Sequence, residues 1–264
     1  MSYFQAVILG IVQGLTEFLP VSSSAHLRFV SSIFGWNDPG AAFSAITQIG
    51  TETAVLIFFR KDILALVNGF LRMPNSKERK LATQIIIGSV PIVIFGFLLK
   101  DVIESNFRSG IIIASSMLLF SFVLAYADKK SVGDRSIDSM KSREAFVFGL
   151  AQSAAIIPGV SRSGGTISAG LLLGFTRVQS ARFSFLLAIP AVLGSGLFEL
   201  RKLNSESTAW PQTLVATLIA FFIGYAVIKW FLNFISTNSF MVFVKYRIVI
   251  SSTLLILFLF GIIK

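Results

Sequence analysis

The densest run of reactive side chains in the sequence is GLTEFLPVSSSAHLRF, residues 14–29. It holds a carboxylate at Glu17, three consecutive serines at 22–24, and His26, the single histidine of the chain. Gln13 lies four positions before Glu17, so on a helix the two side chains share one face. A carboxylate, hydroxyl groups and an imidazole beside a helix-breaking proline are the groups of acid–base and nucleophilic chemistry.

A second run, PGVSRSGGT at 158–166, combines the features of an anion-binding loop. Three glycines, Gly159, Gly164 and Gly165, free the backbone to present N–H groups. Arg162 adds a planar guanidinium suited to phosphate oxygens. The hydroxyl donors are Ser161, Ser163 and Thr166. A helix restarting near Gly164 would point its positive end at a bound anion. The alternative, an arginine that only neutralises Glu17, leaves these hydroxyls and glycines unexplained.

The composition places both runs in a membrane protein. The chain has 264 residues, of which 54% are hydrophobic and 14% charged, whereas soluble domains carry about 25% charged residues. Long unbroken apolar runs predict membrane helices and argue against a β-barrel. The chain has no cysteine, which excludes disulfides. The chain has a net charge of +10, but membrane proteins commonly carry Lys and Arg in their cytoplasmic loops. No patch of basic and aromatic residues accompanies the charge, so we expect no nucleic-acid partner.

The apolar pattern predicts an all-α integral membrane protein with one membrane domain, 1–264. Two apolar regions, 3–34 and 145–176, are broken in the middle, and each half is too short to cross a bilayer. We therefore predict two re-entrant helical hairpins, which membranes tolerate where protein or a watery cavity surrounds the break. Six segments read as full crossings: 41–59, 81–99, 110–127, 182–200, 211–231 and 247–263.

The two broken regions resemble each other. A shift of 139 residues pairs Gly10 with Gly149, Gln13 with Gln152, and Ser22 with Ser161, without a gap. The chain therefore reads as a duplication, with repeats at 1–127 and 145–264, each a hairpin followed by three crossings. Three is an odd number, so the second repeat is inverted. Inverted repeats of this kind place their site near the membrane midplane.

The distribution of positive charge predicts the orientation. Loop 60–80 carries six Lys and Arg residues, loop 128–143 carries five, and Arg177, Arg182, Lys245 and Arg247 bring that side to fifteen. The other side has five: Lys100, Arg108, Arg201, Lys202 and Lys264. Because the side with more positive charges is cytoplasmic, both termini are expected outside.

The two polar runs together offer a carboxylate, a histidine, serines and an anion-binding loop in a membrane protein. We therefore predict phosphate chemistry on a lipid, with Arg162 and a divalent ion on Glu17 neutralising the phosphate charge.

The motifs QGLTEFLPVSSSAH and PGVSRSGGT together resemble the undecaprenyl-diphosphate phosphatase family, of the bacitracin-resistance type. The similarity extends over essentially the whole chain, including AITQIGTETAVLIFFR and ARFSFLLAIPAVLGSG. The resemblance implies hydrolysis of undecaprenyl diphosphate to its monophosphate in the bacterial plasma membrane, for recycling in cell-wall synthesis. It also implies a divalent cation, Mg²⁺ or Ca²⁺, and a site that opens to the outer face. A homodimer is left open.

The resemblance also implies roles for individual residues. Glu17, Ser22, Ser23, His26 and Arg162 are then catalytic, and Glu17 with Gln13 binds the metal. The implied substrate-binding residues are Ser161, Arg162, Ser163, Gly164, Gly165, Thr166 and Gln48. The first motif position is Glu or Gln in this family, and here Gln13 leaves one carboxylate fewer. Glu52, four residues after Gln48, stands where we expect an apolar residue, and its role is left open.

Two other functions are consistent with parts of the pattern. Inverted repeats with re-entrant hairpins also occur in transporters, so a polyprenyl-phosphate flippase or an anion transporter is the alternative. The serine–histidine turn argues against transport as the only activity. A lipid phosphatase that works with two histidines is excluded, because the chain has one. The sequence leaves open whether Ser22, Ser23, His26 or water attacks phosphorus.

Overall fold

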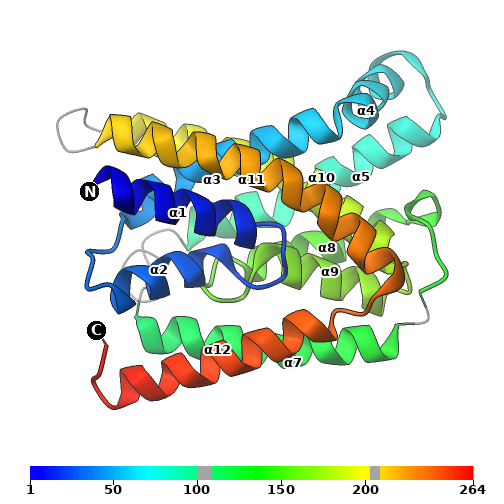
Figure 1. Ribbon diagram of the computed structural model, residues 1–264. Helices are drawn as coiled ribbons and strands as arrows, with labels where there is room; N and C mark the ends of the chain where they lie inside the picture. Colours follow the sequence, from blue (N-terminus) through cyan, green and yellow to red (C-terminus); the bar gives the residue numbers. More distant parts are fainter. Residues whose placement is uncertain (100–108, 132, 203–208, 264) are drawn as a thin grey trace.

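The described part of the protein is a bundle of helices. A computed structural model describes residues 1–99, 109–131, 133–202 and 209–263, without the side chains of residues 41 and 198–202. Within these ranges the only β contact is one isolated bridge between Arg135 and Phe175. The prediction of an all-α protein is therefore confirmed, and Figure 1 shows the helices running roughly side by side along the molecule.

Both broken regions form helical hairpins. In the first, α1 (Tyr3–Thr16) and α2 (Ser23–Ile33) pack on each other across the break. In the second, α8 (Ser142–Ala154) and α9 (Arg162–Leu172) do the same. Each helix has 11 to 14 residues, about 16–21 Å at 1.5 Å per residue. That length is too short for a full crossing, as the sequence predicts.

Among the described residues, five helices are long and apolar enough to cross a membrane. They are α5 (Lys77–Leu98), α7 (Gly110–Lys130), α10 (Arg177–Lys202), α11 (Trp210–Thr237) and α12 (Met241–Leu259). The sixth predicted crossing, 41–59, corresponds to α3 (Gly40–Phe58), whose described apolar stretch, Ala42–Phe58, is shorter. Pro91 and Pro190 lie inside α5 and α10, as expected of membrane helices.

The segment 60–80, predicted as a loop, is mostly helical. It forms α4 (Arg60–Arg72) and the first residues of α5, joined by a short turn. Charges at both ends of α4 suggested a loop, but its apolar residues follow a helical spacing. Leu66 is buried, whereas Leu64, Val67 and Leu71 are exposed. Its 13 residues cannot span a bilayer, so α4 lies beside the bundle end, as Figure 1 shows. A 3₁₀ turn, η1 (Ile137–Ser139), lies in the predicted loop 128–143.

Glycines let the first helix of each hairpin approach a long helix closely. A methyl group on Gly10 would lie 2.6 Å from the carbonyl oxygen of Ala216 in α11. Gly149, its partner in the 139-residue shift, lies equally tightly against the backbone of Gly88 in α5. Close backbone approach at small residues is how membrane helices gain packing energy. The two hairpins are thus held at equivalent places by α11 and α5.

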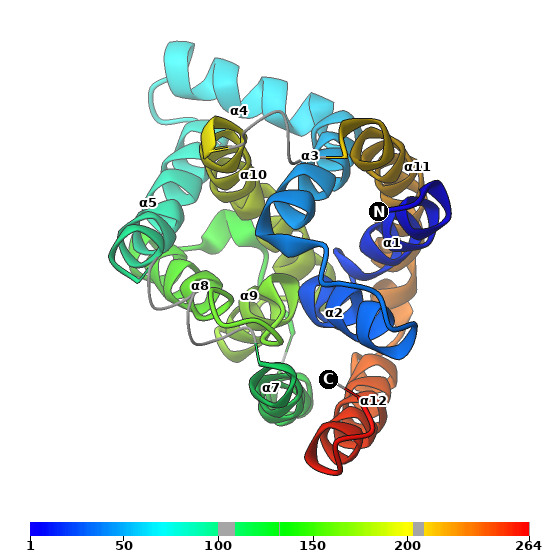
Figure 2. The ribbon, with the colours of Figure 1, turned by 90° about the vertical axis from the view of Figure 1, so that its left-hand side faces the viewer.

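The second hairpin is the more deeply enclosed. Residues Ser163 to Leu171 of α9 are all buried, and α7, α8 and α10 pack around the helix. Figure 2 shows α9 inside the ring formed by these neighbours. An ion pair between Arg135 and Glu144, with N–O distances of 2.8 and 3.1 Å, fixes the preceding loop to the start of α8. The paired guanidinium lowers the pKa of the Glu144 carboxyl below its ordinary value.

Candidate active site

The two hairpin tips meet inside the bundle. Nη2 of Arg162 lies 2.5 Å from Oε1 of Glu17, although 145 positions separate the two residues. The Ser163 hydroxyl donates to the carbonyl oxygen of Leu19 at 3.1 Å, a second bond between the tips. The sequence predicts that the two tips meet, because the backbone at each helix break and the carboxylate of Glu17 need partners in an apolar surrounding.

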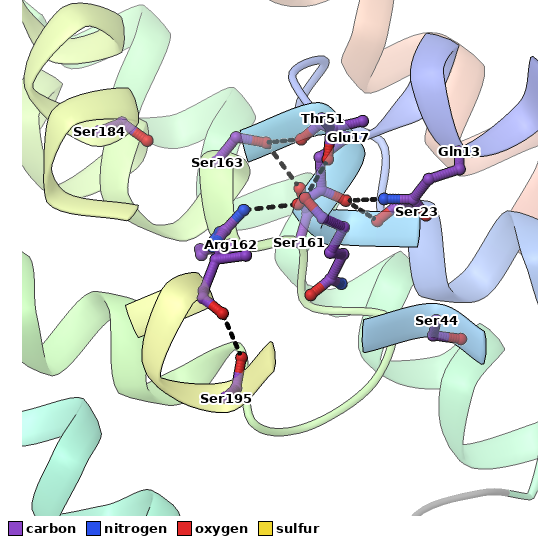
Figure 3. Close-up of polar contacts among 12 residues, drawn as sticks. Gln13, Glu17, Ser23, Ser44, Thr51, Ser161, Arg162, Ser163, Ser184 and Ser195 are labelled. Atoms are coloured by element: carbon purple, nitrogen blue, oxygen red, sulfur yellow. Dashed lines mark hydrogen bonds and ion pairs between the residues drawn. The ribbon is translucent and has the colours of Figure 1, made fainter. Parts of the chain in front are cut away.

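Glu17 is the centre of the polar contacts at this junction. Its Oε2 accepts the Ser23 hydroxyl at 2.5 Å and the Gln13 amide at 2.8 Å, while Oε1 receives Arg162. Only 4% of the Glu17 side chain is exposed. Figure 3 shows Gln13 and Ser23 on one side of this carboxylate and Arg162 on the other. Four predicted site residues are therefore brought together by direct hydrogen bonds.

The two tips share an unusual backbone conformation. Ser22 and Ser161, the last residues before α2 and α9, have φ of 73° and 72°. Positive φ in a residue with a side chain is uncommon and costs about 1–3 kcal/mol, so it persists only where surrounding contacts enforce it. The 139-residue shift pairs these two serines, so the sequence similarity extends to local backbone geometry.

The remaining residues of the first tip face elsewhere. The Ser22 hydroxyl bonds that of Ser24 at 3.2 Å. His26 Nδ1 lies 2.8 Å from the Ser22 carbonyl oxygen, and its Nε2 lies 2.7 Å from the Tyr246 hydroxyl. The two rings are stacked with centroids 5.6 Å apart. His26 is thus held between its own tip and α12, and neither of these contacts joins it to Glu17.

The hydrogen-bonding groups of the second tip are largely engaged within the protein. The Ser161 hydroxyl accepts the Gly164 N–H at 3.1 Å and lies 3.2 Å from the Ser163 hydroxyl. The Gly165 N–H donates to the Ser161 carbonyl oxygen, and the Thr166 hydroxyl contacts Ser184 of α10 at 2.5 Å. These contacts set the shape of the turn and leave the Arg162 guanidinium as the group of this tip that is suited to an anion.

Gln48 is placed on α3 and is only half-buried. Its backbone oxygen accepts the Thr51 hydroxyl at 2.9 Å. Glu52, one turn later on the same helix, is 1% exposed and lines a small cavity with Glu17 and Arg162. Of the two, Glu52 therefore faces the site directly.

The cavity between the tips is small. From the sequence we predict one cavity shared by the two tips and wide enough for a diphosphate. The space lined by Glu17, Glu52 and Arg162 has a volume of about 10 Å³, enough for one water-sized species. The physical reason is the ion pair itself, because the Arg162 side chain fills the gap between the tips. Admitting a phosphate group therefore requires Arg162 to move off Glu17.

Arg247 has a structural role at the site that we did not predict from the sequence. It was counted among cytoplasmic loop charges, but it is fully buried in α12, so that count falls to fourteen. Its guanidinium donates to the carbonyl oxygens of Pro20 at 2.8 Å and of Gly159 and Val160 at 3.2 Å. Further bonds reach Met117 and Ser121 of α7. One arginine thus ties both tips to α7 and α12.

A signal for Arg247 was present in the sequence. A charge inside an apolar stretch at membrane depth is a functional candidate by default, and Arg247 opens the predicted crossing 247–263. The five charges counted on the other side, Lys100, Arg108, Arg201, Lys202 and Lys264, lie outside the residues whose side chains are described.

The described residues offer few ligands for a metal ion. No group of three His, Cys, Asp or Glu side chains that could hold one occurs among them. Mg²⁺ is commonly held by one or two carboxylates, with water and substrate phosphates completing its shell. Glu17 fits that role, and the buried Oε1 of Gln13 has no hydrogen-bond partner in the described part of the chain. The oxygen atoms of Glu17 and Gln13 therefore suit a hard divalent cation, with oxygen atoms of the substrate as its further ligands.

Comparison with known proteins gives one consistent family. The family model for the bacitracin resistance protein BacA matches residues 6–253. The chain is 48% identical to "Undecaprenyl-diphosphatase 2" of Streptomyces coelicolor, over 100% of this chain and 97% of that protein. It is 50% identical to the protein of the same name from Streptomyces avermitilis, over 97% and 95%.

A protein named "Undecaprenyl-diphosphatase" from Nocardioides sp. is 47% identical over 100% of this chain and 99% of its own length. These similarities cover both hairpins and all the long helices, so they concern the whole fold and not a single motif. The chain belongs to the bacitracin resistance protein BacA family.

Proposed function

We propose that this protein is an undecaprenyl-diphosphatase. It hydrolyses the phosphoric anhydride bond of undecaprenyl diphosphate, releasing phosphate and undecaprenyl phosphate. This recycles the lipid carrier for cell-wall synthesis and confers resistance to bacitracin. Family membership and the names of full-length relatives support the activity. The single observation that carries it is the contact chain Ser23–Glu17–Arg162, which links a hydroxyl, a carboxylate and a guanidinium across the two tips.

Ser23 is the nucleophile that the geometry favours. Its hydroxyl already donates to Glu17, so the carboxylate is placed to take the proton as Oγ attacks the terminal phosphorus. The anhydride bond breaks and undecaprenyl phosphate leaves, and water then releases phosphate from the serine. Ser22 and His26 have other partners, which leaves them to shape the turn.

Arg162 is the group that binds the substrate's phosphates. Its planar fork matches two phosphate oxygens, and neutralising their charge is the main demand of phosphoryl transfer. A bound divalent cation would act as a Lewis acid and offset the negative charge that develops on the phosphate. Glu17, with the amide oxygen of Gln13, would hold it. Ser161, Ser163 and Thr166 keep the turn in the shape that presents Arg162.

The protein sits in the plasma membrane with both termini outside and the site open outward. The fourteen cytoplasmic charges support this orientation. The termini and the α4–α5 turn lie at opposite ends of the bundle, which fits six crossings and two inverted repeats (Figure 1). The matching backbone of Ser22 and Ser161 supports the duplication. In this arrangement the hairpins enter from opposite faces.

Phosphate release from undecaprenyl diphosphate by the purified protein tests the proposal. We expect release that a metal chelator abolishes, that Ser23→Ala reduces by at least a hundredfold, and that Ser24→Ala, the exposed neighbour, leaves nearly unchanged. Movement of polyprenyl phosphate across vesicles without phosphate release would instead favour a flippase. Equal activity of Ser23→Ala and the intact protein would assign the attack to His26 or water.

A further inference from the structure

Glu52 is a carboxylate at the site, and one of its oxygens, Oε1, has no hydrogen bond to any described residue. It lies on α3, is 1% exposed, and lines the cavity between the tips. Its Oε1 is fully buried, and no described donor or acceptor lies within hydrogen-bond distance. An isolated buried carboxylate costs several kcal/mol unless a charge or a proton compensates it. The fold nevertheless directs Glu52 into the one place where Glu17 and Arg162 meet.

The charges around this cavity do not balance. The lining includes two carboxylates, Glu17 and Glu52, and one guanidinium, Arg162. The ion pair of Arg162 is with Glu17, at 2.5 Å, and no ion pair to Glu52 occurs among the described residues. A proton on Glu52 would neutralise the charge but leave the buried Oε1 without a hydrogen bond. A cation bound at Oε1 would meet both needs.

The size and chemistry of the cavity favour a small hard cation. Its volume of about 10 Å³ holds one water-sized species. Besides the two carboxylates, the hydroxyl-bearing residues Ser163 and Ser184 line it. Oxygen ligands from one or two carboxylates, completed by water and phosphate oxygens, are what Mg²⁺ and Mn²⁺ prefer. An organic ligand or a phosphate does not fit in this space.

We propose that Glu52 is a metal ligand that, together with Glu17, holds a divalent cation at the junction of the hairpin tips. The inference deepens the proposed function, because it assigns the cation a second carboxylate, from α3. Gln13 carries no charge, so Glu52 supplies the negative charge that the first hairpin lacks. When Arg162 turns from Glu17 to a phosphate, the cation takes its place beside Glu17.

Metal binding without turnover tests this site. We would titrate the purified full-length protein in detergent with Mn²⁺ and follow the EPR signal of free Mn²⁺. The intact protein is expected to bind one Mn²⁺ per chain, and Glu52→Gln to weaken the Kd by about tenfold to a hundredfold. The matched control Asp134→Asn removes an exposed carboxylate before η1 and should leave the Kd unchanged. An unchanged Kd in Glu52→Gln would overturn the proposal.

A second readout separates this inference from the proposed function. In phosphate release, Glu52→Gln should need about tenfold more Mg²⁺ for half-maximal rate and recover at saturating Mg²⁺. If the intact protein hydrolyses substrate but Glu52→Gln has the same Mg²⁺ dependence, the metal site is wrong and the function stands. If Glu52→Gln loses Mn²⁺ binding while the intact protein releases no phosphate, the metal site stands and the function fails. Should Glu52→Gln not fold, Glu52→Met, which removes the carboxylate and keeps a similar length, replaces it, and wild-type Mn²⁺ binding by that variant overturns the site.

Discussion

At the scale of single residues, Glu17 receives hydrogen bonds from three directions. Gln13 approaches from α1, Ser23 from the start of α2, and Arg162 from the other hairpin. The sequence was sufficient to predict Gln13 and Arg162 as partners, because a buried carboxylate needs donors and few are available in an apolar surrounding. It was not sufficient to predict that Ser23, and not Ser22, makes the contact. That choice depends on the positive φ of Ser22, which turns its side chain toward Ser24.

Replacing Arg162 by lysine tests the guanidinium as a phosphate clamp. Arg162→Lys keeps the charge but loses the planar fork, so we expect kcat/KM to fall by roughly 10²–10³. The rate of phosphate release from undecaprenyl diphosphate is the measurement. Arg143→Lys, an exposed position at the start of α8, is the matched control. Turnover near normal in Arg162→Lys would reduce Arg162 to a counter-ion of Glu17.

At the scale of elements, the breaks in the hairpins were the easiest features to predict. Proline, glycine and serine clusters stop a helix for known reasons, and α1, α2, α8 and α9 end and begin within a few residues of those clusters. The helix α4 was not predicted, because the charges of residues such as Arg60 and Lys61 indicate a loop. The size of the cavity was also beyond prediction, since it depends on the rotamer of Arg162.

Arg247 is the residue that we expect to hold the two tips in register. Arg247→Lys would leave carbonyl oxygens of both tips unsatisfied, at about 1–3 kcal/mol each, because an ammonium cannot reproduce five directed bonds. We expect a clear drop in Tm and a loss of activity, measured by thermal unfolding in detergent. Lys245→Met, an exposed position on the same helix, should keep the wild-type Tm. A wild-type Tm in Arg247→Lys would contradict this role.

At the scale of the whole molecule, the architecture brings two polar tips together inside the bundle, where each supplies hydrogen-bond partners to the other. Each tip leaves backbone groups that lipid cannot satisfy, and the other tip, α7 and α12 satisfy them. The duplication stays a prediction from paired glycines and serines, and the similar close packing of Gly10 and Gly149 is consistent with it.

The inverted repeat makes a direct prediction about topology. The chain has no cysteine, so single cysteines can be placed at position 2, in the α4–α5 turn, and near the C-terminus. A membrane-impermeant thiol reagent added to intact cells should label both termini and leave the turn unlabelled. Labelling of a terminus and the turn from the same side would contradict the inverted repeat. Asn75, in that turn, is an exposed site for the substitution.

The central claim is that the two tips act as one active site, and a double-mutant cycle tests it most directly. Glu17→Gln, Arg162→Lys and the double variant are compared in kcat/KM for phosphate release. Groups that act as a unit are strongly non-additive, so the double variant should lose about as much as the more severe single one. Losses that multiply, with the double variant reduced by the product of the two single effects, would show that the tips act independently and contradict the account.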